Sequence, residues 1–313
     1  MSTASPGTLK FLGTAGARFA VSTQLRHSGG LLWTMGGTTL WVDPGPGALV
    51  RALSSRPKID PSKVDALLVT HPHLDHVGDA TAIVEAMTRG GFARRGTLLA
   101  PRSALERDPV VFRYAQEFVT RREILVEGGR YQLGPGLFLR TPLAHDHGVE
   151  TYGYRLEGEA FSAGHVIDTL WMDELPRAYA NVDLLLVNTT RIAGRDRRYL
   201  HLGLDDAEAL ATAIRPRLCV LTHFGMQLPP ARAHQAAQAI SSRTGVPTLA
   251  ARDGWTLDLG ELPARPPGPA AEAGETLTGP AGSVRAQGQA DEPAPERAGG
   301  LGGRGSSGPP ARE

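Results

Sequence analysis

Short apolar runs alternate with amphipathic stretches between residues 8 and 262. Several runs are continuously apolar, which is typical of strands buried on both faces. The pattern predicts strands at Leu9–Leu12, Thr38–Val42, Ala66–Val69, Thr97–Ala100, Tyr152–Leu156, Leu184–Val187 and Leu218–Thr222. Apolar residues at helical spacing predict helices at Ala80–Thr88, Val110–Val119, Asp205–Ile214 and Ala231–Ser241. Many strands with interspersed helices favour an α+β class in which two sheets pack face to face with helices outside, a four-layer αββα arrangement.

The composition changes at Pro263. The last 51 residues contain 11 Gly and 9 Pro, and their only large aliphatic residues are Leu277, Val284 and Leu301. Such a segment buries too little apolar area to offset the entropy lost on ordering. We therefore expect one folded domain over residues 1–262 and a disordered Gly/Pro/Ala-rich tail over residues 263–313.

Bulk composition is that of an ordinary globular protein, with 41% hydrophobic and 21% charged residues. The 33 basic and 32 acidic residues nearly cancel, so no overall field attracts nucleic acid or an anionic membrane. Only Lys10, Lys58 and Lys63 are lysines. Codon bias is the simplest explanation for so much arginine, although individual arginines stay open as phosphate-binding candidates.

The single cysteine, Cys219, lies in an apolar run and is expected to be a small buried residue, because it has no partner for an intramolecular disulfide. The first residues lack the basic and apolar regions of a signal peptide. No apolar run approaches the length of a membrane span. We expect a cytoplasmic protein without a membrane partner.

The strongest chemical signal is the string from Thr70 to Gly78, which directly follows an apolar strand and reads Thr-His-Pro-His-Leu-Asp-His-Val-Gly. His71 and His73 are two residues apart, so extended backbone projects them to the same side. Asp75 and His76 follow on the turn into the next helix. Imidazole nitrogen and carboxylate oxygen are the ligands that zinc and similar divalent ions prefer. The string therefore predicts a metal site.

The His-x-His-x-Asp-His string resembles the hallmark of the metallo-β-lactamase superfamily. Further segments resemble that family's motifs in the same order along the chain. They are Phe11–Thr14, Trp41–Gly45, Thr141–His147 with Tyr152–Arg155, Val166–Thr169 and Leu221–Gly225. The resemblance covers about residues 8–225 and implies the metallo-β-lactamase sandwich fold. It is closest to the phosphodiesterase and ribonuclease Z-like branch, in particular to phosphoribosyl cyclic phosphate phosphodiesterase-like proteins.

The resemblance implies two divalent metal ions. The metal ligands would be His71, His73, Asp75, His76, His147, Asp168 and His223. His71, His73 and His147 would hold one ion, and Asp75, His76 and His223 the other. Asp168 would be shared, and Asp43 would support a ligand. Zinc is expected, with manganese as the alternative, because mixed His/carboxylate sites accept several ions.

The third motif leaves a choice between His145 and His147, which project to the same side of an extended stretch. We choose His147 because its spacing to Gly153 matches the family. Asp75 and His201 are the catalytic candidates, and the resemblance implies that His201 contacts the scissile phosphate or protonates the leaving oxygen. His165 is interpreted as incidental, His27 as a loop residue near the mouth of the site, and His234 as a helix-surface residue.

The function implied by this resemblance is hydrolysis of a small phosphodiester or cyclic phosphate by a hydroxide that bridges the two ions. A transfer-RNA 3′-processing ribonuclease is the first alternative. It is weakened by the short step from His147 to Asp168, by the sequence Asn188-Thr189-Thr190 where that family tends to carry Glu, and by the balanced charge. A thioester or lactone hydrolase and a non-catalytic metal-binding sensor are the others. We expect a small-molecule substrate rather than nucleic acid, and the branch suggests a homodimer.

Overall fold

The computed structural model describes residues 6–267. Its strands are β1 (Gly7–Phe11), β2 (Leu31–Met35), β3 (Thr38–Val42), β4 (Ala66–Leu68), β5 (Thr97–Pro101), β6 (Arg121–Leu125), β7 (Gly129–Gly134), β8 (Leu137–Thr141), β9 (Tyr154–Glu157), β10 (Ser162–Val166), β11 (Leu184–Asn188), β12 (Leu218–Thr222), β13 (Thr248–Ala250) and β14 (Thr256–Asp258). Its α-helices are α1 (Arg18–Thr23), α2 (Ala48–Ser54), α3 (Leu74–Val77), α4 (Ala80–Thr88), α5 (Arg113–Gln116), α6 (Leu175–Ala178), α7 (Leu204–Ile214) and α8 (Pro230–Thr244).

The strands form two seven-stranded sheets. The first has the order β14-β1-β2-β3-β4-β5-β6 and the second the order β13-β12-β11-β10-β9-β8-β7. Each sheet combines antiparallel pairs with a parallel block: β3 to β6 in the first sheet and β10 to β13 in the second. The parallel blocks are important for the site, because their carboxyl ends gather side chains at one edge of a sheet.

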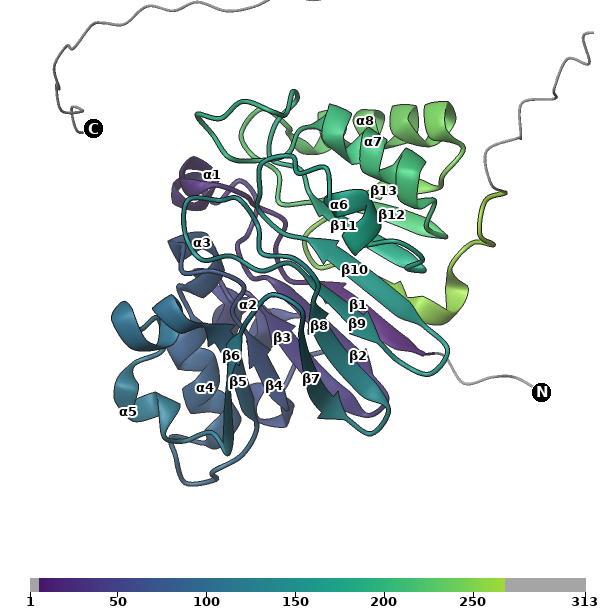
Figure 1. The fold of residues 1–313 in the computed structure, drawn as a ribbon. Helices are drawn as coiled ribbons and strands as arrows, with labels where there is room; N and C mark the ends of the chain where they lie inside the picture. Colours follow the sequence, from purple (N-terminus) through teal and green to yellow (C-terminus); the bar gives the residue numbers. More distant parts are fainter. Residues whose placement is uncertain (1–5, 268–313) are drawn as a thin grey trace, which may run out of the picture. The chain divides into compact units, whose positions relative to one another are not determined.

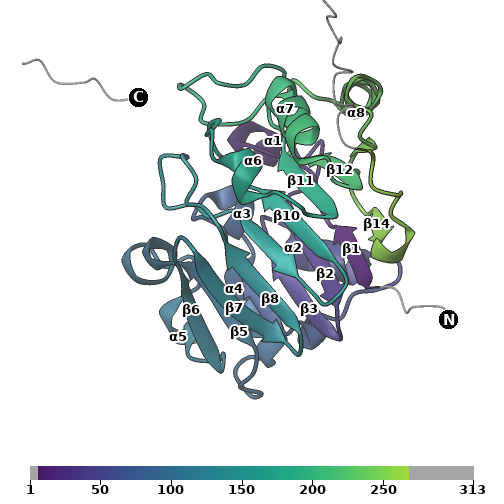
Figure 2. The same cartoon turned by 45° about the vertical axis from the view of Figure 1, so that its right-hand side comes forward.

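Three apolar clusters define four layers. One cluster joins residues of both sheets, such as Trp33 and Leu156, and fills the space between them. A second packs α2 and α4 on the outer face of the first sheet, and a third packs α7 and α8 on the outer face of the second. Figures 1 and 2 show the helices on opposite sides of the two sheets. The predicted four-layer αββα fold is confirmed.

Alternation along the buried strands explains their unbroken apolar character. In β11, Leu184 and Leu186 face the space between the sheets, whereas Leu185 and Val187 pack under the outer helices. Both faces of the strand are thus covered, so its first four positions are apolar, and only its last residue, Asn188, is polar. The same logic applies to β4 and β12.

All seven predicted strands are present, and three of the four predicted helices match α4, α7 and α8 closely. The helix predicted at Val110–Val119 is wrong over most of its length, because only Arg113–Gln116 forms an α-helical turn. Val111, Ala115 and Val119 are nevertheless buried, so their helical spacing reports packing against the sheet rather than a continuous helix.

The domain boundary predicted at residue 262 falls inside the described segment. Arg217 Nε and Nη2 donate hydrogen bonds to the carbonyls of Pro263 and Leu262, and Arg265 donates to the Val182 carbonyl and to Asp183. The folded part therefore continues to at least Arg265. The rest of the predicted tail, residues 268–313, lies outside the described residues. No helix in the described part of the chain is long and apolar enough to cross a membrane.

Candidate metal centre

The candidate site lies where the parallel strands of both sheets end. Asp43 follows β3, Asp168 follows β10 by two residues, and His223 follows β12 directly. β3 pairs in parallel with β4, and β10 and β12 both pair in parallel with β11. Side chains after these strands consequently meet at one edge, although they are far apart in the chain.

The segment after β4 supplies four of the predicted ligands. The chain leaves β4 and reaches His71, whose side chain is fully buried. α3 then begins at Leu74 with His73 as its N-cap, which places Asp75 and His76 on the helix. Both of these side chains are buried. A strand that turns sharply into a helix thus concentrates donors from a short piece of chain.

The structure brings all seven predicted side chains together in two groups. The first group contains His71, His73 and His147, and the second contains Asp75, His76, Asp168 and His223. Within each group the potential ligand atoms lie within 4.8 Å of one another. This is the division that the family resemblance implies for two ions.

Asp168 lies between the two groups. Its Oδ2 atom is 3.8 Å from His71 Nε2 and 3.7 Å from His147 Nε2 in the first group. The same carboxylate is 3.3 Å from His76 Nε2 and, through Oδ1, 3.1 Å from His223 Nδ1 in the second. One carboxylate within reach of both groups suits a ligand shared by two cations.

The donor set fits divalent cations. Ring nitrogens face each other at 3.0 Å between His76 and His223 and at 3.1 Å between His147 and His73. His71 Nε2 is buried and has no hydrogen-bond partner among the described residues. An orphaned imidazole nitrogen aimed into a cluster of imidazoles and carboxylates is costly unless a cation binds it.

The pKa values of the clustered side chains shift in different directions. Burial, together with neighbouring imidazoles, holds the pKa of His71 well below its usual value and lowers the pKa of His73 to about 4. Burial opposes the charged form of Asp168, but His223 and His201 outweigh it and lower the pKa of that carboxyl. The opposite holds for His76, where the carboxylates Asp75 and Asp43 overcome burial and raise the pKa. The carboxyl group of Asp168 is therefore ionised and available as a ligand at neutral pH.

Side chains and carbonyls outside the cluster orient the imidazoles. The carboxylate of Asp43 accepts hydrogen bonds from the backbone N–H and hydroxyl of Thr70 and lies 2.9 Å from His76 Nδ1. Thr190 Oγ1 lies 3.0 Å from His223 Nδ1, and His147 Nδ1 lies 2.9 Å from the Leu200 carbonyl oxygen. Such partners fix which ring nitrogen faces a metal.

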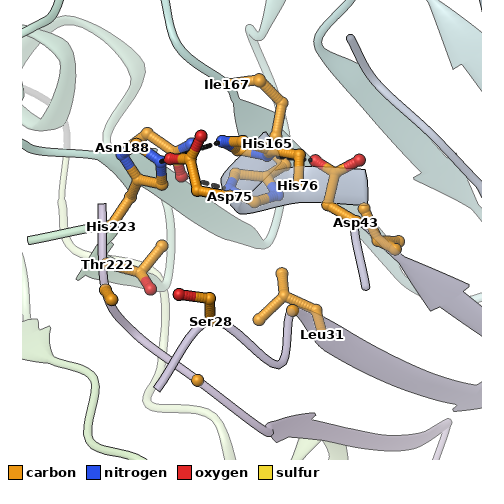
Figure 3. A pocket seen from close by; sticks show the side chains of 14 residues that line it. Ser28, Leu31, Asp43, Asp75, His76, His165, Ile167, Asn188, Thr222 and His223 are labelled. Carbon is orange, nitrogen blue, oxygen red and sulfur yellow. Dashed lines mark hydrogen bonds and ion pairs between the residues drawn. The ribbon is translucent and has the colours of Figure 1, made fainter. Parts of the chain in front are cut away.

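A buried polar chain supports Asp168 from behind. Asn188 Nδ2 donates a 2.8 Å hydrogen bond to Asp168 Oδ1, and Asn188 Oδ1 lies 2.8 Å from His165 Nε2. His165 Nδ1 lies 3.2 Å from the Tyr154 hydroxyl, which in turn accepts a hydrogen bond from Trp33 Nε1. Figure 3 shows His165 and Asn188 beside Asp75, His76 and His223.

Beneath the cluster lies a small cavity of about 40 Å³, lined in part by Ser28, Asp43 and His76 (Figure 3). This volume accommodates only a few water molecules. Ser28 Oγ is buried and has no hydrogen-bond partner among the described residues, so a water in this cavity would satisfy it. The space in which a substrate fits lies elsewhere.

A larger cavity of about 630 Å³ opens over the cluster. His73, His147 and Asp168 form part of its floor, and His201 also lines it. His201 Nδ1 is 3.8 Å from Asp168 Oδ2, and burial lowers the pKa of His201 to about 4. The cavity thus gives a small molecule access to the cluster and to the predicted catalytic histidine.

The structure favours His147 over His145. His147 belongs to the first group, whereas His145 Nε2 lies 3.0 Å from the Tyr179 hydroxyl and is not among the clustered donors. Gly153 is required here, because a Cβ at that position would collide with the Tyr179 hydroxyl and the His145 ring. The glycine at this position therefore has a packing basis.

The sequence matches a known protein family. The family model for the beta-lactamase superfamily domain matches residues 38–224, which include all seven predicted ligands. An uncharacterised protein of Methanocaldococcus jannaschii is 31% identical over 255 residues, covering 80% of this chain and 94% of that protein. The chain belongs to the metallo-β-lactamase superfamily.

Other relatives of this superfamily member carry functional names. A ribonuclease Z of Kineococcus radiotolerans is 32% identical over 173 residues, and the match covers about half of each protein, 52%. A UPF0173 metal-dependent hydrolase of an Anaeromyxobacter species is 28% identical over 219 residues, covering 64% of this chain and 72% of the relative.

Two solved structures share the fold. The metallo-β-lactamase fold protein YhfI of Bacillus subtilis has a TM-score of 0.68 at 18% identity, covering 81% of this chain and 99% of YhfI. A diphosphatase of the PhnP family has a TM-score of 0.60 at 22% identity, covering 80% of this chain and 96% of the diphosphatase. At these identities, the likeness shows the fold alone.

Sequence reasoning missed several residues of this metallo-β-lactamase site. His165 is not incidental, because it is buried and bonded to Asn188 behind Asp168. Asn188 is the last residue of β11 and Thr190 follows the strand by two residues, at the same edge as the ligands, so polar residues at the end of a buried strand were the available signal. His27 lies 4.0 Å from Asp253, outside the cluster, and His234 is exposed on α8 as predicted.

Proposed function

We propose that this protein is a dinuclear metal-dependent phosphodiesterase that acts on a small phosphodiester or cyclic phosphate. The observation that carries the proposal is the convergence of seven imidazole and carboxylate side chains in two groups beneath one open cavity. Two bound divalent ions, with zinc expected, would lower the pKa of bound water and stabilise negative charge on the transferring phosphoryl group. The substrate would be a small molecule.

The chain's own residues have separate tasks in this proposal. Asp168 joins the two groups, and Asn188 fixes its carboxylate by a hydrogen bond. Asp75 Oδ2 accepts a hydrogen bond from the Ala17 backbone N–H, which restricts its orientation. His201 stands at the edge of the cluster and faces the cavity, where its ring would contact the scissile phosphate or the leaving oxygen.

A ribonuclease acting on transfer RNA is the second candidate, favoured by the relatives named ribonuclease Z. The segment between His147 and Asp168 is occupied by β9 and β10, which pair directly with each other in the second sheet. This leaves no inserted arm between these two residues. Extended RNA binding also favours a strongly basic surface, and the chain carries a net charge of only +1.

The proposal is tested by metal analysis and a substrate panel. Purified protein is expected to contain close to two divalent ions per chain. It is then assayed on bis-p-nitrophenyl phosphate, cyclic nucleotides, a precursor transfer RNA, a thioester and a lactone. We expect hydrolysis of the small phosphodiesters. Activity confined to the thioester or lactone would overturn the phosphodiester assignment, and a protein with metal but no activity on any of them would support the sensor alternative.

A substitution of His201 tests its role separately. We expect His201→Ala to retain the metal content while turnover falls about a hundredfold, the usual scale of a lost proton-transfer group. His234→Ala removes an exposed histidine of α8 and serves as the matched control. Unchanged turnover in His201→Ala would remove His201 from the mechanism, whereas loss of metal would reassign it as a ligand.

A further inference from the structure

The segment between Arg191 and Gly203 forms a loop whose two ends adjoin. Arg191 and Gly203 pair in a parallel bridge, and the Thr190 N–H donates a 3.2 Å hydrogen bond to the Leu202 carbonyl. Compact loops with adjoining ends are packed by their own side chains and often carry functional groups. We call residues 191–203 the bridged loop.

The bridged loop brings two groups to the candidate metal centre. The Leu200 carbonyl oxygen lies 2.9 Å from His147 Nδ1, so it sets which ring nitrogen of this predicted ligand faces the cluster. His201, the predicted catalytic histidine, lines the large cavity, and its Nδ1 is 3.8 Å from Asp168 Oδ2. Neither Leu200 nor His201 belongs to a helix or a strand. Their positions therefore depend on the contacts that hold the loop.

The backbone of the bridged loop is held in an unfavourable conformation at two residues. Arg195 has a φ of 60° and Leu200 has a φ of 43°, so both lie in the left-handed region, which is unfavourable for residues other than glycine. Such conformations persist only where surrounding contacts enforce them. The contacts around the loop, rather than its own backbone preference, therefore decide where it lies.

One buried carboxylate at the start of α7 anchors both arms of the loop. Asp206 Oδ2 accepts a 3.1 Å hydrogen bond from the Gly203 N–H, and Asp206 Oδ1 accepts a 3.0 Å hydrogen bond from Arg195 Nε. A Cβ at Gly194 would collide with this carboxylate, so the loop backbone lies directly against it. A fully buried carboxylate is costly unless it is paired, and Arg195 supplies the pairing charge.

Arg195 also ties the loop to the segment that carries Asp168. Its guanidinium carbon lies 4.5 Å from the ring centroid of Trp171, which follows Asp168 by three residues. A guanidinium stacks favourably on an aromatic ring. That segment is fixed in turn, because the Leu170 N–H donates a 2.8 Å hydrogen bond to the Asp146 carbonyl. One side chain thus joins the loop to α7 and to the residues after the shared carboxylate.

We propose that Arg195 and Asp206 form a clamp that holds the bridged loop and thereby positions His201 over the metal cluster. In the described structure Arg195 does not line the cavity, so it is a positioning residue that acts through the loop rather than by touching the substrate. This inference rests on the proposed phosphodiesterase function for the reaction that His201 serves. The clamp itself can be measured without catalysis.

The kinetic test is a double-substitution cycle on bis-p-nitrophenyl phosphate, with the full chain and zinc in excess. We expect Arg195→Gln to lower kcat about tenfold and to change KM less than about twofold, because a displaced catalytic group costs turnover rather than substrate binding. Arg195→Lys is expected to restore part of kcat, because it keeps a cation beside Asp206. In a His201→Ala background, Arg195→Gln is expected to lower kcat no further, since the group that it positions is already absent.

Arg243→Gln is the matched control for this cycle. Arg243 also pairs with a carboxylate of α7, Glu208, at 2.6 Å, and its side chain is 57% exposed against 58% for Arg195. It lies outside the bridged loop, so we expect kcat to be unchanged. A wild-type kcat in Arg195→Gln, or an equal effect of that substitution with and without His201, would overturn the clamp and leave the phosphodiesterase standing.

Limited digestion with trypsin measures the clamp without catalysis. Trypsin cleaves after arginine, and Arg197 and Arg198 are exposed in the bridged loop. Because cleavage of a folded protein follows the population of locally opened chain, we expect cleavage at these two bonds to be about tenfold faster in Arg195→Gln. Arg243→Gln is expected to be cleaved there at the wild-type rate. Mass spectrometry of the digest identifies the bonds that are cut.

The two tests separate the clamp from the phosphodiesterase. Faster cleavage of the loop in Arg195→Gln, with no hydrolysis of any phosphodiester by the wild-type protein, would refute the phosphodiesterase but retain the clamp. Equal cleavage rates in Arg195→Gln and the wild type would overturn the clamp, whatever the kinetics. An absence of both hydrolysis and faster cleavage would overturn both.

Discussion

The two halves of the molecule build the candidate centre in opposite ways. The first half supplies His71, His73, Asp75 and His76 from one turn between β4 and α3. The second half supplies His147, Asp168 and His223 from three separate loops that follow β8, β10 and β12. A short turn carries its geometry in its own sequence, whereas the three loops depend on the pairing of strands that are far apart in the chain.

The residues that orient the donor side chains also differ between the two halves. In the first half, the single carboxylate of Asp43 contacts both Thr70 and His76. In the second half, Thr190, Asn188 and the Leu200 carbonyl each hold one different donor. A substitution of Asp43 would therefore remove the contacts of Thr70 and His76 together. A substitution of Thr190 or Asn188 would remove the contact of a single donor.

The largest effect is expected from the residue that joins the halves. Asp168→Ala should lower the metal content at both groups, because its carboxylate is within 4 Å of imidazoles in each. A loss of about 5 kcal/mol of transition-state stabilisation would lower turnover roughly five thousandfold. Metal analysis and kinetics on bis-p-nitrophenyl phosphate measure both quantities.

Asp108→Asn, which changes a well-exposed carboxylate, is the control for that experiment. Full retention of two ions in Asp168→Ala would show that the two groups are independent, and the picture of a joining carboxylate would then be wrong.

A smaller effect is expected from the supporting residues, and it should differ between the halves. We expect Asp43→Asn to weaken metal affinity by about a hundredfold and Asn188→Ala by about tenfold, the range usual for groups that orient metal ligands. Asp43 contacts both Thr70 and the predicted ligand His76, whereas Asn188 contacts one carboxylate oxygen of Asp168. Competition with a chelating dye measures both affinities, and the reverse ranking would contradict concentrated support in the first half.

The smallest effect concerns the buried chain behind Asp168. Burial lowers the pKa of His165 to about 3, so the folded protein keeps this ring neutral where the unfolded chain, with a pKa near 6.5, binds a proton. The unfolded state then holds more protons, and stability falls as pH decreases below about 6.5. Near pH 5 the contribution of this ring is about 1.4 kcal/mol per pH unit.

Denaturant unfolding of the metal-free protein between pH 6 and pH 4 tests this contribution. We expect the slope of the free energy of unfolding against pH to be smaller in His165→Gln by that amount, with His234→Ala unchanged. Equal slopes in His165→Gln and the wild type would show that the ring is not kept neutral by burial.

The sequence predicted the four-layer fold but not every strand in it. Continuous apolar runs located β4, β11 and β12, because strands covered on both faces are apolar over most of their length. β10 was missed, since its sequence Ser-Ala-Gly-His-Val has small and polar residues where other central strands have Leu and Val. Its neighbours β9 and β11, rather than its own residues, make it a strand.

By itself, the sequence determined the donor types and the compact motif from His71 to His76, because residues a few positions apart are placed by the local backbone. The choice of His147 over His145 came from the family's spacing, and the tertiary structure places His147 in the cluster. Only the tertiary structure decided that His165 and Asn188 stand behind Asp168 and that Arg191 lines the cavity. These relations join segments separated by tens of residues. They are set by strand pairing and close packing between distant parts of the chain, which spacing along the sequence does not encode.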